Sequence, residues 1–99
     1  MNSAMTMQVT VLGSTGSIGT NTLDVVARHL DLYQVFALSA HSQVDLLLAQ
    51  CLQFKPRYAV MTSAIHARDL RDRLAQAGCR TEVLDGVHAL EQIASHPDV

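Results

Sequence analysis

Residues 9–26 read VTVLGSTGSIGTNTLDVV, an apolar stretch that runs into three glycines and then into a segment with helical spacing. The glycines occupy positions 13, 16 and 19, in the pattern G-x-x-G-x-x-G. A glycine turn between a buried strand and a helix is typical of phosphate-binding folds, because the first N–H groups of the helix have no partner within it. This stretch therefore predicts a strand–turn–helix unit and directs the search for function to an anion.

Each glycine of the turn has its own expected role. Gly13 permits the sharp turn off the strand, Gly16 lets the backbone approach a diphosphate without a Cβ in the way, and Gly19 lets the helix lie close to the sheet. The hydroxyl donors expected to supplement the amides are Ser14, Thr15 and Ser17. The alternative is a structural turn that binds nothing, which the entropic cost of three glycines disfavours.

The rest of the chain repeats this alternation of strand and helix. Apolar or β-branched runs predict strands over residues 8–12, 35–38, 58–61 and 81–84. Apolar residues at i, i+3, i+4 spacing predict helices that begin near Ser17, Ser42, Ser63 and Asp85 and end near Arg28, Lys55, Gly78 and Pro97. Ser42, Ser63 and Asp85 are the expected N-caps. On the first helix, the expected apolar face is Ile18, Thr22, Val25, Val26 and His29.

This order predicts the fold class. Short connections between units of this kind leave no place for hairpins, so the strands run parallel. We expect an α/β fold, a Rossmann-like parallel sheet with helices on both faces, truncated to about four β-α units. Residues 1–7 are expected to be a flexible leader, and residues 8–99 a partial dinucleotide-binding domain.

Composition limits the function classes. The chain of 99 residues is 48% hydrophobic and 16% charged, which excludes disorder, and its net charge of −2 disfavours nucleic-acid and anionic-membrane partners. No apolar run approaches the roughly 20 residues that cross a bilayer, and the start of the chain lacks the features of a signal peptide. Two cysteines without a C-x-x-C pair fit a reducing cytoplasm. Scattered histidines predict neither a metal site nor a catalytic group.

The end of the second strand carries information about the cofactor. NAD-binding units place an acidic residue about 20 residues beyond the glycines, where it binds the ribose 2′-hydroxyl. Here residues 39–43 read Ser-Ala-His-Ser-Gln, and the first carboxylate, Asp45, already lies inside the expected helix. His41, Ser42 and Gln43 would accept a 2′-phosphate that an acid would repel. We therefore expect NADP(H) rather than NAD(H), the alternative being that residues 41–43 are only a capping turn.

Three segments, GSTGSIGTNTLDVV, CLQFKPRYAVM and GCRTEVLDG, together resemble the N-terminal part of the 1-deoxy-D-xylulose 5-phosphate reductoisomerase family. The resemblance implies cytoplasmic homodimers of the non-mevalonate isoprenoid pathway. They use NADPH and Mg²⁺ or Mn²⁺ to convert 1-deoxy-D-xylulose 5-phosphate to 2-C-methyl-D-erythritol 4-phosphate. It also implies cofactor contacts from Thr15, Gly16, Ser17 and Ile18, with residues 41–43 near the adenosine phosphate, where many members have Gly-Lys-Asn or Gly-Arg-Asn. The candidate cofactor-binding residues are Gly13, Ser14, Thr15, Gly16, Ser17, Ile18, His41, Ser42 and Gln43.

In that family the metal ligands, the substrate-phosphate site and a mobile lid lie downstream. The resemblance therefore implies an NADPH-binding portion without the catalytic and C-terminal domains, inactive alone and unable to bind the sugar phosphate. We also expect one edge of the strand over residues 8–12 to lie open and to mediate self-association. The alternatives are a fragment of an atypical short-chain reductase or of an aspartate-semialdehyde-type dehydrogenase, and a regulatory module that senses NADP(H) without turning it over.

Overall fold

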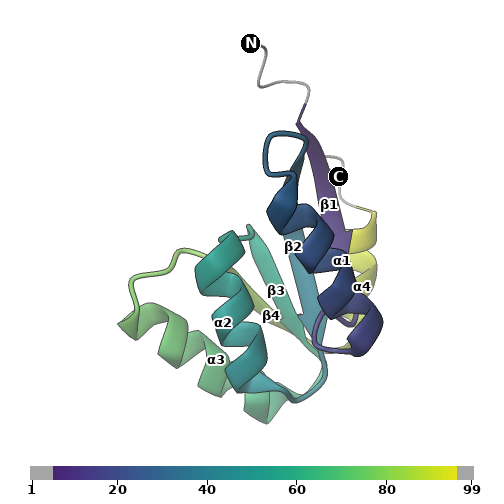
Figure 1. Cartoon of the computed structure of the whole chain (residues 1–99). Coiled ribbons are helices and arrows are strands. Elements are labelled where there is room, and N and C mark those ends of the chain that lie inside the picture. Colours follow the sequence, from purple (N-terminus) through teal and green to yellow (C-terminus); the bar gives the residue numbers. More distant parts are fainter. Residues whose placement is uncertain (1–5, 96–99) are drawn as a thin grey trace.

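The computed structural model describes residues 6–95, in which strands and helices alternate throughout (Figure 1). The elements in chain order are β1 (Met7–Val11), α1 (Ser17–Arg28), β2 (Tyr33–Ala40), α2 (Val44–Phe54), β3 (Tyr58–Met61), α3 (Ala64–Gln76), β4 (Glu82–Asp85) and α4 (Val87–Ala94). The expected leader falls largely outside the described residues, and its last residue, Met7, already belongs to β1. Among the described helices, none combines the length and the apolar character that spanning a bilayer requires.

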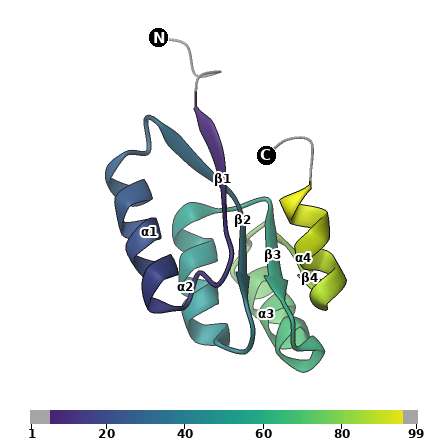
Figure 2. The same ribbon diagram turned by 90° about the vertical axis from the view of Figure 1, so that its right-hand side faces the viewer.

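The four strands form one parallel sheet in the order β1-β2-β3-β4. Each strand is added on the same side of the one before it. Since crossovers between parallel strands are right-handed, α1, α2 and α3 must all lie on one face. Figure 2 shows α4 across the sheet from α1 and α2. The predicted α/β fold, with a parallel sheet and helices on both faces, is confirmed.

Two apolar clusters hold these layers together. The larger joins α1, α2 and α3 to the sheet through fully buried side chains such as Leu38, Leu47 and Leu70. The smaller lies under α4, where Ala89 and Ile93 pack on β2 and β3. The sheet is therefore buried on both faces, which explains why β2 reads as a nearly continuous apolar run rather than an alternating one.

β1 lies at the edge of the sheet. Within residues 6–95 it pairs only with β2, because β4 pairs with β3 on the far side. The open edge expected for the first strand is thus present, and it belongs to the strand that leads into the glycine turn.

The buried face of α1 differs from the predicted one. Gly19, Leu23 and Val26 face the sheet, whereas Ile18 is 82% exposed and Val25 is 48% exposed. The helical spacing was correct, but the face is rotated because a glycine, not a large apolar residue, occupies the closest contact with the turn. The structure thus leaves Ile18 at the surface, where the helix begins.

Two predicted N-caps are wrong. Gln43 rather than Ser42 precedes α2, and Asp85 is the last residue of β4, with Gly86 (φ 88°) turning the chain into α4. Ser63 does precede α3, but its hydroxyl contacts His66 Nδ1 at 2.6 Å instead of capping a backbone amide. The end predicted at Pro97 lies outside the described residues.

Candidate functional site

The glycine turn joins the carboxyl end of β1 to the first turn of α1, and the fold itself requires two of its glycines. Gly13 has φ +67°, a backbone conformation that side chains disfavour. A Cβ on Gly19 would lie 2.3 Å from the carbonyl oxygen of Gly13 and 2.7 Å from the Cα of Ser14, so only glycine lets α1 begin against the turn. Both predicted roles, the sharp turn and the close approach of the helix, are confirmed.

Gly16 differs from its two neighbours in this respect. Its φ of −79° and ψ of 171° are open to any residue, and an added Cβ would come only within 3.5 Å of the carbonyl oxygen of Gly13, an ordinary contact. Gly16 is also exposed. Neither backbone conformation nor internal packing therefore explains a glycine here, and its bare surface faces solvent.

The backbone amides of the turn fall into two groups. Gly13 N donates to Ser39 Oγ at 2.9 Å, Ser14 N donates to the Ser39 carbonyl at 2.8 Å, and Gly16 N donates to the Gly13 carbonyl at 3.1 Å. Within residues 6–95, the amides of Thr15, Ser17, Ile18 and Gly19 donate no hydrogen bond to a protein acceptor. The first group fixes the turn, and the second remains available at the positive end of the α1 dipole.

The expectation that the Ser14 hydroxyl adds a donor for phosphate is wrong. Ser14 is fully buried, its Oγ donates to Gln50 Oε1 at 2.7 Å, and Gln50 Nε2 donates back to the Ser14 carbonyl at 2.8 Å. A buried hydroxyl needs a partner, and α2 supplies one. Ser14 therefore ties the turn to α2 and cannot reach a ligand outside it.

Sequence analysis missed the two residues that hold the turn, Gln50 and Ser39. Gln50 is 6% exposed and Ser39 is 4% exposed. A signal for both was present in the sequence. Gln50 follows Leu47 by three residues and so falls on the apolar face of α2, while Ser39 interrupts the apolar run of β2. A polar residue at a position where the pattern predicts a buried apolar one indicates that its side chain has a specific hydrogen-bond partner in the interior.

The segment from His41 to Gln43 lies beside the glycine turn. It follows β2, the parallel neighbour of β1, so both segments leave the same edge of the sheet, and Ser39 contacts Gly13 and Ser14 directly. All three side chains are exposed. His41 Nδ1 lies 2.6 Å from Thr62 Oγ1, and this contact orients the ring at the end of β3.

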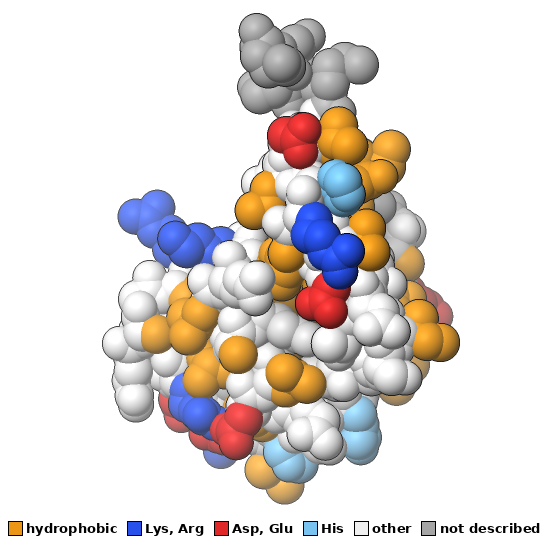
Figure 3. Space-filling model, in the orientation of Figure 1, with side chains coloured by type: hydrophobic (Ala, Val, Ile, Leu, Met, Phe, Trp, Pro, Cys, Tyr) orange, Lys and Arg blue, Asp and Glu red, His pale blue; other side chains and the backbone are white. Residues whose placement is uncertain are grey.

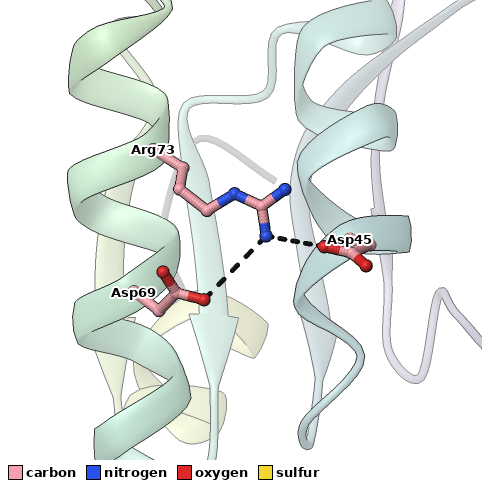
Figure 4. A network of polar contacts seen from close by, with 3 residues as sticks. All are labelled: Asp45, Asp69 and Arg73. Carbon is pink, nitrogen blue, oxygen red and sulfur yellow. Dashed lines mark hydrogen bonds and ion pairs between the residues drawn. The ribbon is translucent and has the colours of Figure 1, made fainter.

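Asp45, the first carboxylate after β2, is engaged elsewhere. Its Oδ1 lies 2.6 Å from Arg73 Nη1 on α3, and the same nitrogen lies 3.9 Å from Asp69 Oδ2 (Figure 4). The hydrogen bond that Arg73 donates to the Asp45 carboxylate is the main cause that raises the pKa of Arg73 above its ordinary value. Asp45 therefore links α2 to α3. The segment that contains His41, residues 39–43, has no acidic residue of its own.

Neither cysteine nor the acidic residues form a second reactive centre among residues 6–95. No group of three or more His, Cys, Asp or Glu side chains there could hold a metal ion. Burial, and to a lesser degree the neighbouring Cys79, raise the pKa of Cys51 to about 12.

Comparison with known proteins places this architecture in a family. The sequence model of one protein family, 1-deoxy-D-xylulose 5-phosphate reductoisomerase, matches residues 9–99. The chain belongs to this family. Its members from Aromatoleum aromaticum and Nitrosomonas europaea are 56% and 54% identical to it, over 92% and 95% of this chain. Because the match covers 23% of each of those relatives, the chain spans about a quarter of their length.

Solved structures of the family share the fold. The reductoisomerase from Zymomonas mobilis in complex with NADPH is 38% identical, with a TM-score of 0.88 over 99% of this chain and 25% of the other. A DOX-P reductoisomerase in complex with NADPH, fosmidomycin and magnesium is 35% identical, with a TM-score of 0.90 over 94% of this chain and 22% of the other. The family membership decides against the two other reductase families considered from the sequence.

Proposed function

We propose that this chain is the NADPH-binding portion of a 1-deoxy-D-xylulose 5-phosphate reductoisomerase. The observation that carries the proposal is the set of unpartnered amides of Thr15, Ser17 and Ile18 around the exposed Gly16. These amides stand at the amino end of α1, where the helix dipole favours negative charge. Their arrangement suits the diphosphate of a dinucleotide, and the similar structures that contain NADPH support this ligand.

The residues of the turn divide the work of binding. Gly13 and Ser14 are held by Ser39 and Gln50, so they keep the loop in place rather than contact the cofactor. Thr15, Ser17 and Ile18 then offer N–H groups that donate to no protein acceptor among residues 6–95, and Gly16 leaves room for phosphate oxygens. Because the donors are fixed before the ligand arrives, little conformational entropy is lost on binding.

The preference for NADPH over NADH rests on the second strand. The ribose of the adenosine would lie near residues 41–43, where His41 and Ser42 and the amino end of α2 offer donors. Asp45, which could have repelled a 2′-phosphate, is paired with Arg73. One charge-assisted hydrogen bond contributes about 1.5 kcal/mol or more, so we expect NADPH to bind roughly tenfold more tightly than NADH.

For the whole protein we propose the reaction of the family, in which 1-deoxy-D-xylulose 5-phosphate is converted to 2-C-methyl-D-erythritol 4-phosphate in isoprenoid synthesis. NADPH supplies the hydride of the reductive step, and Mg²⁺ or Mn²⁺ would be held outside residues 6–95. We further propose that the whole protein is a cytoplasmic homodimer, and that this chain binds cofactor but neither substrate nor metal and has no activity alone. Residues 8–99 form part of the cofactor domain.

The proposal is tested by titrating the chain with NADPH and NADH and following the nucleotide fluorescence. Gly16→Val should keep the fold, since its backbone conformation suits any residue, yet weaken NADPH binding at least about tenfold by blocking the approach of phosphate. Ala75→Val, which places the same valine side chain on the exposed surface of α3, is the matched control. Equal affinity of the wild type for both nucleotides, or unchanged NADPH binding by Gly16→Val, would contradict the proposal.

A further inference from the structure

One histidine stands where the proposed cofactor would carry its 2′-phosphate. His41 directly follows β2, is exposed, and lies at the edge of the sheet that carries the glycine turn. Among residues 39–43 it is the only side chain able to carry a positive charge, since the segment contains neither Lys nor Arg. Figure 3 shows pale blue histidine side chains at the lower end of the molecule, where the strands end. The cation that this segment offers to a phosphate is therefore an imidazolium, whose charge depends on pH.

The end of β3 holds the ring of His41 in place. Its Nδ1 lies 2.6 Å from Thr62 Oγ1. Thr62 is itself fixed beside the histidine, because its amide donates to the Ala40 carbonyl at 3.1 Å and the Ser63 amide donates to the His41 carbonyl at 3.4 Å. Nε2, on the other side of the ring, has no hydrogen-bond partner in the part of the chain that the structure describes. One ring nitrogen is thus engaged by the protein, and the other remains for a ligand.

Protonation changes what this second nitrogen offers. In the imidazolium both ring nitrogens carry a hydrogen, so Nδ1 donates to the Thr62 hydroxyl and Nε2 donates outward with a positive charge. In the neutral ring, Nε2 is an acceptor when Nδ1 donates to Thr62, and an uncharged donor when the hydroxyl donates to Nδ1. An acceptor repels phosphate oxygens, and an uncharged donor forms a hydrogen bond roughly half as strong as a charged one. The ring therefore binds a phosphate best when it is protonated.

Charged groups on the neighbouring elements set the background for this change. Near the amino ends of α2, α3 and α4 and at the end of β4, they are Asp45, His66, Arg68, Asp69, Asp85, His88 and Glu91. Asp45 is paired with Arg73, and His66 Nδ1 lies 2.6 Å from Ser63 Oγ. Carboxylates and guanidinium groups ordinarily keep their charge between pH 6.5 and pH 8.5. A change in phosphate binding over this range thus comes from a histidine or from the phosphate itself.

We propose that the protonation of His41, whose ring Thr62 orients, sets the preference of this chain for NADPH over NADH. This inference rests on the proposed function, which places the 2′-phosphate at residues 41–43. NADH lacks that phosphate, so the ratio of the NADPH affinity to the NADH affinity isolates the contact. A charge-assisted hydrogen bond accounts for about tenfold in affinity, and an imidazole is ordinarily about half protonated at pH 6.5. The ratio should therefore fall about fivefold from pH 6.5 to pH 8.5.

Titrations with each nucleotide at pH 6.5 and pH 8.5, followed by nucleotide fluorescence, measure this ratio. His41→Lys supplies a cation whose charge is constant over this range, so its ratio should vary only with the phosphate, which ordinarily loses its second proton at about pH 6. His88→Asn, which removes an exposed imidazole from α4, is the matched control and should keep the fivefold fall. His66→Asn, which removes the imidazole bound to Ser63, should keep it as well.

The role of Thr62 as a positioning residue has its own test. Thr62→Val removes the hydroxyl that orients the ring and should lower the ratio at pH 6.5 about threefold, since ordering of the charged donor is lost. Thr62→Ser, which keeps a hydroxyl, should restore the wild-type ratio and its fall with pH. Equal ratios in the two variants would show that the hydroxyl does not position His41 and would overturn this part of the inference.

Three results would refute the role of His41. They are a wild-type ratio that is the same at both pH values, a fall in His41→Lys as large as in the wild type, and a fall that disappears in His66→Asn while His41→Lys retains it. NADPH binding with a preference that does not change with pH leaves the proposed function standing and refutes this inference alone. Failure of NADPH to bind at either pH refutes the proposed function, and this inference with it.

Discussion

Replacing Gln50 with leucine tests how the glycine turn is held. The side chain is buried and makes two hydrogen bonds to Ser14, one to its hydroxyl and one to its carbonyl. Leucine fills similar space but leaves the Ser14 carbonyl without its strong donor and the hydroxyl with only the 3.3 Å contact to the Ser39 carbonyl. Gln50→Leu should therefore bind NADPH more weakly, because the amides of the turn lose their fixed position.

The cost in stability follows from these two bonds. A hydrogen bond contributes about 1 kcal/mol net, and a buried polar group left unsatisfied costs about 1–3 kcal/mol. Added apolar contact from leucine offsets part of this, so we expect a loss of about 2–4 kcal/mol in the free energy of unfolding. For a domain of this size that corresponds to a fall in Tm of roughly 10–25 °C.

Circular dichroism during heating and in urea measures the loss, with Gln53→Leu as the matched control. Gln53 lies on the same helix one turn farther and is exposed, so its replacement should change stability by less than about 0.5 kcal/mol. Combining Gln50→Leu with Ser14→Ala should cost less than the sum of the two single changes, because both partners of one bond are then removed. Equal stability of Gln50→Leu and Gln53→Leu, with equal NADPH affinity, would refute the reasoning.

Three further predictions concern the close contact at Gly19, the buried thiol and the open sheet edge. Gly19→Ala should lower the free energy of unfolding, measured in urea, by about 3 kcal/mol or more, because the added Cβ would lie 2.3 Å and 2.7 Å from backbone atoms. Gly16→Ala, where the added Cβ has room, should lower it by less than about 1 kcal/mol. Equal losses for the two substitutions would contradict this prediction. Burial raises the pKa of Cys51 from its ordinary value of 9.0 to about 12 in the folded chain, so the contribution of this thiol to stability is complete below pH 9 and is lost as the pH rises toward 12. Denaturation at pH 8 and pH 10 should show that Cys51→Ala flattens this decline, and an unchanged slope would count against it. Because β1 pairs only with β2 among the described residues, sedimentation velocity should show concentration-dependent self-association, which a single monomeric species at every concentration would exclude.

The fold was predictable because local patterns and tertiary burial agree over most of this chain. β3 is observed over the residues expected from its apolar run, and α1 has the expected bounds. In both places the apolar spacing, the breaker residues and the parallel topology lead to the same result. The helix starts were less predictable, since Ser42 and Asp85 have cap-forming side chains but α2 begins after Gln43 and α4 begins after Gly86, whose φ of 88° favours glycine.

The site was predictable in part. The position of the turn and the roles of Gly13 and Gly19 follow from the spacing of the glycines, because conformation and close contact both demand them. The direction of the Ser14 side chain does not follow, since a serine in a turn can face a ligand or the interior equally well. Its partner, Gln50, lies 36 residues away, and only the assembled fold brings the two together.

The central claim is that bare amides of the glycine turn bind the diphosphate of NADPH. Two-dimensional ¹H–¹⁵N NMR of the labelled chain during an NADPH titration tests it most directly, because each backbone amide reports separately. We expect saturable shifts that are largest at Thr15, Ser17 and Ile18 and small at Gly13 and Ser14, whose amides already donate to Ser39. Binding that leaves the first three amides unshifted, or no binding at millimolar NADPH, would contradict the claim.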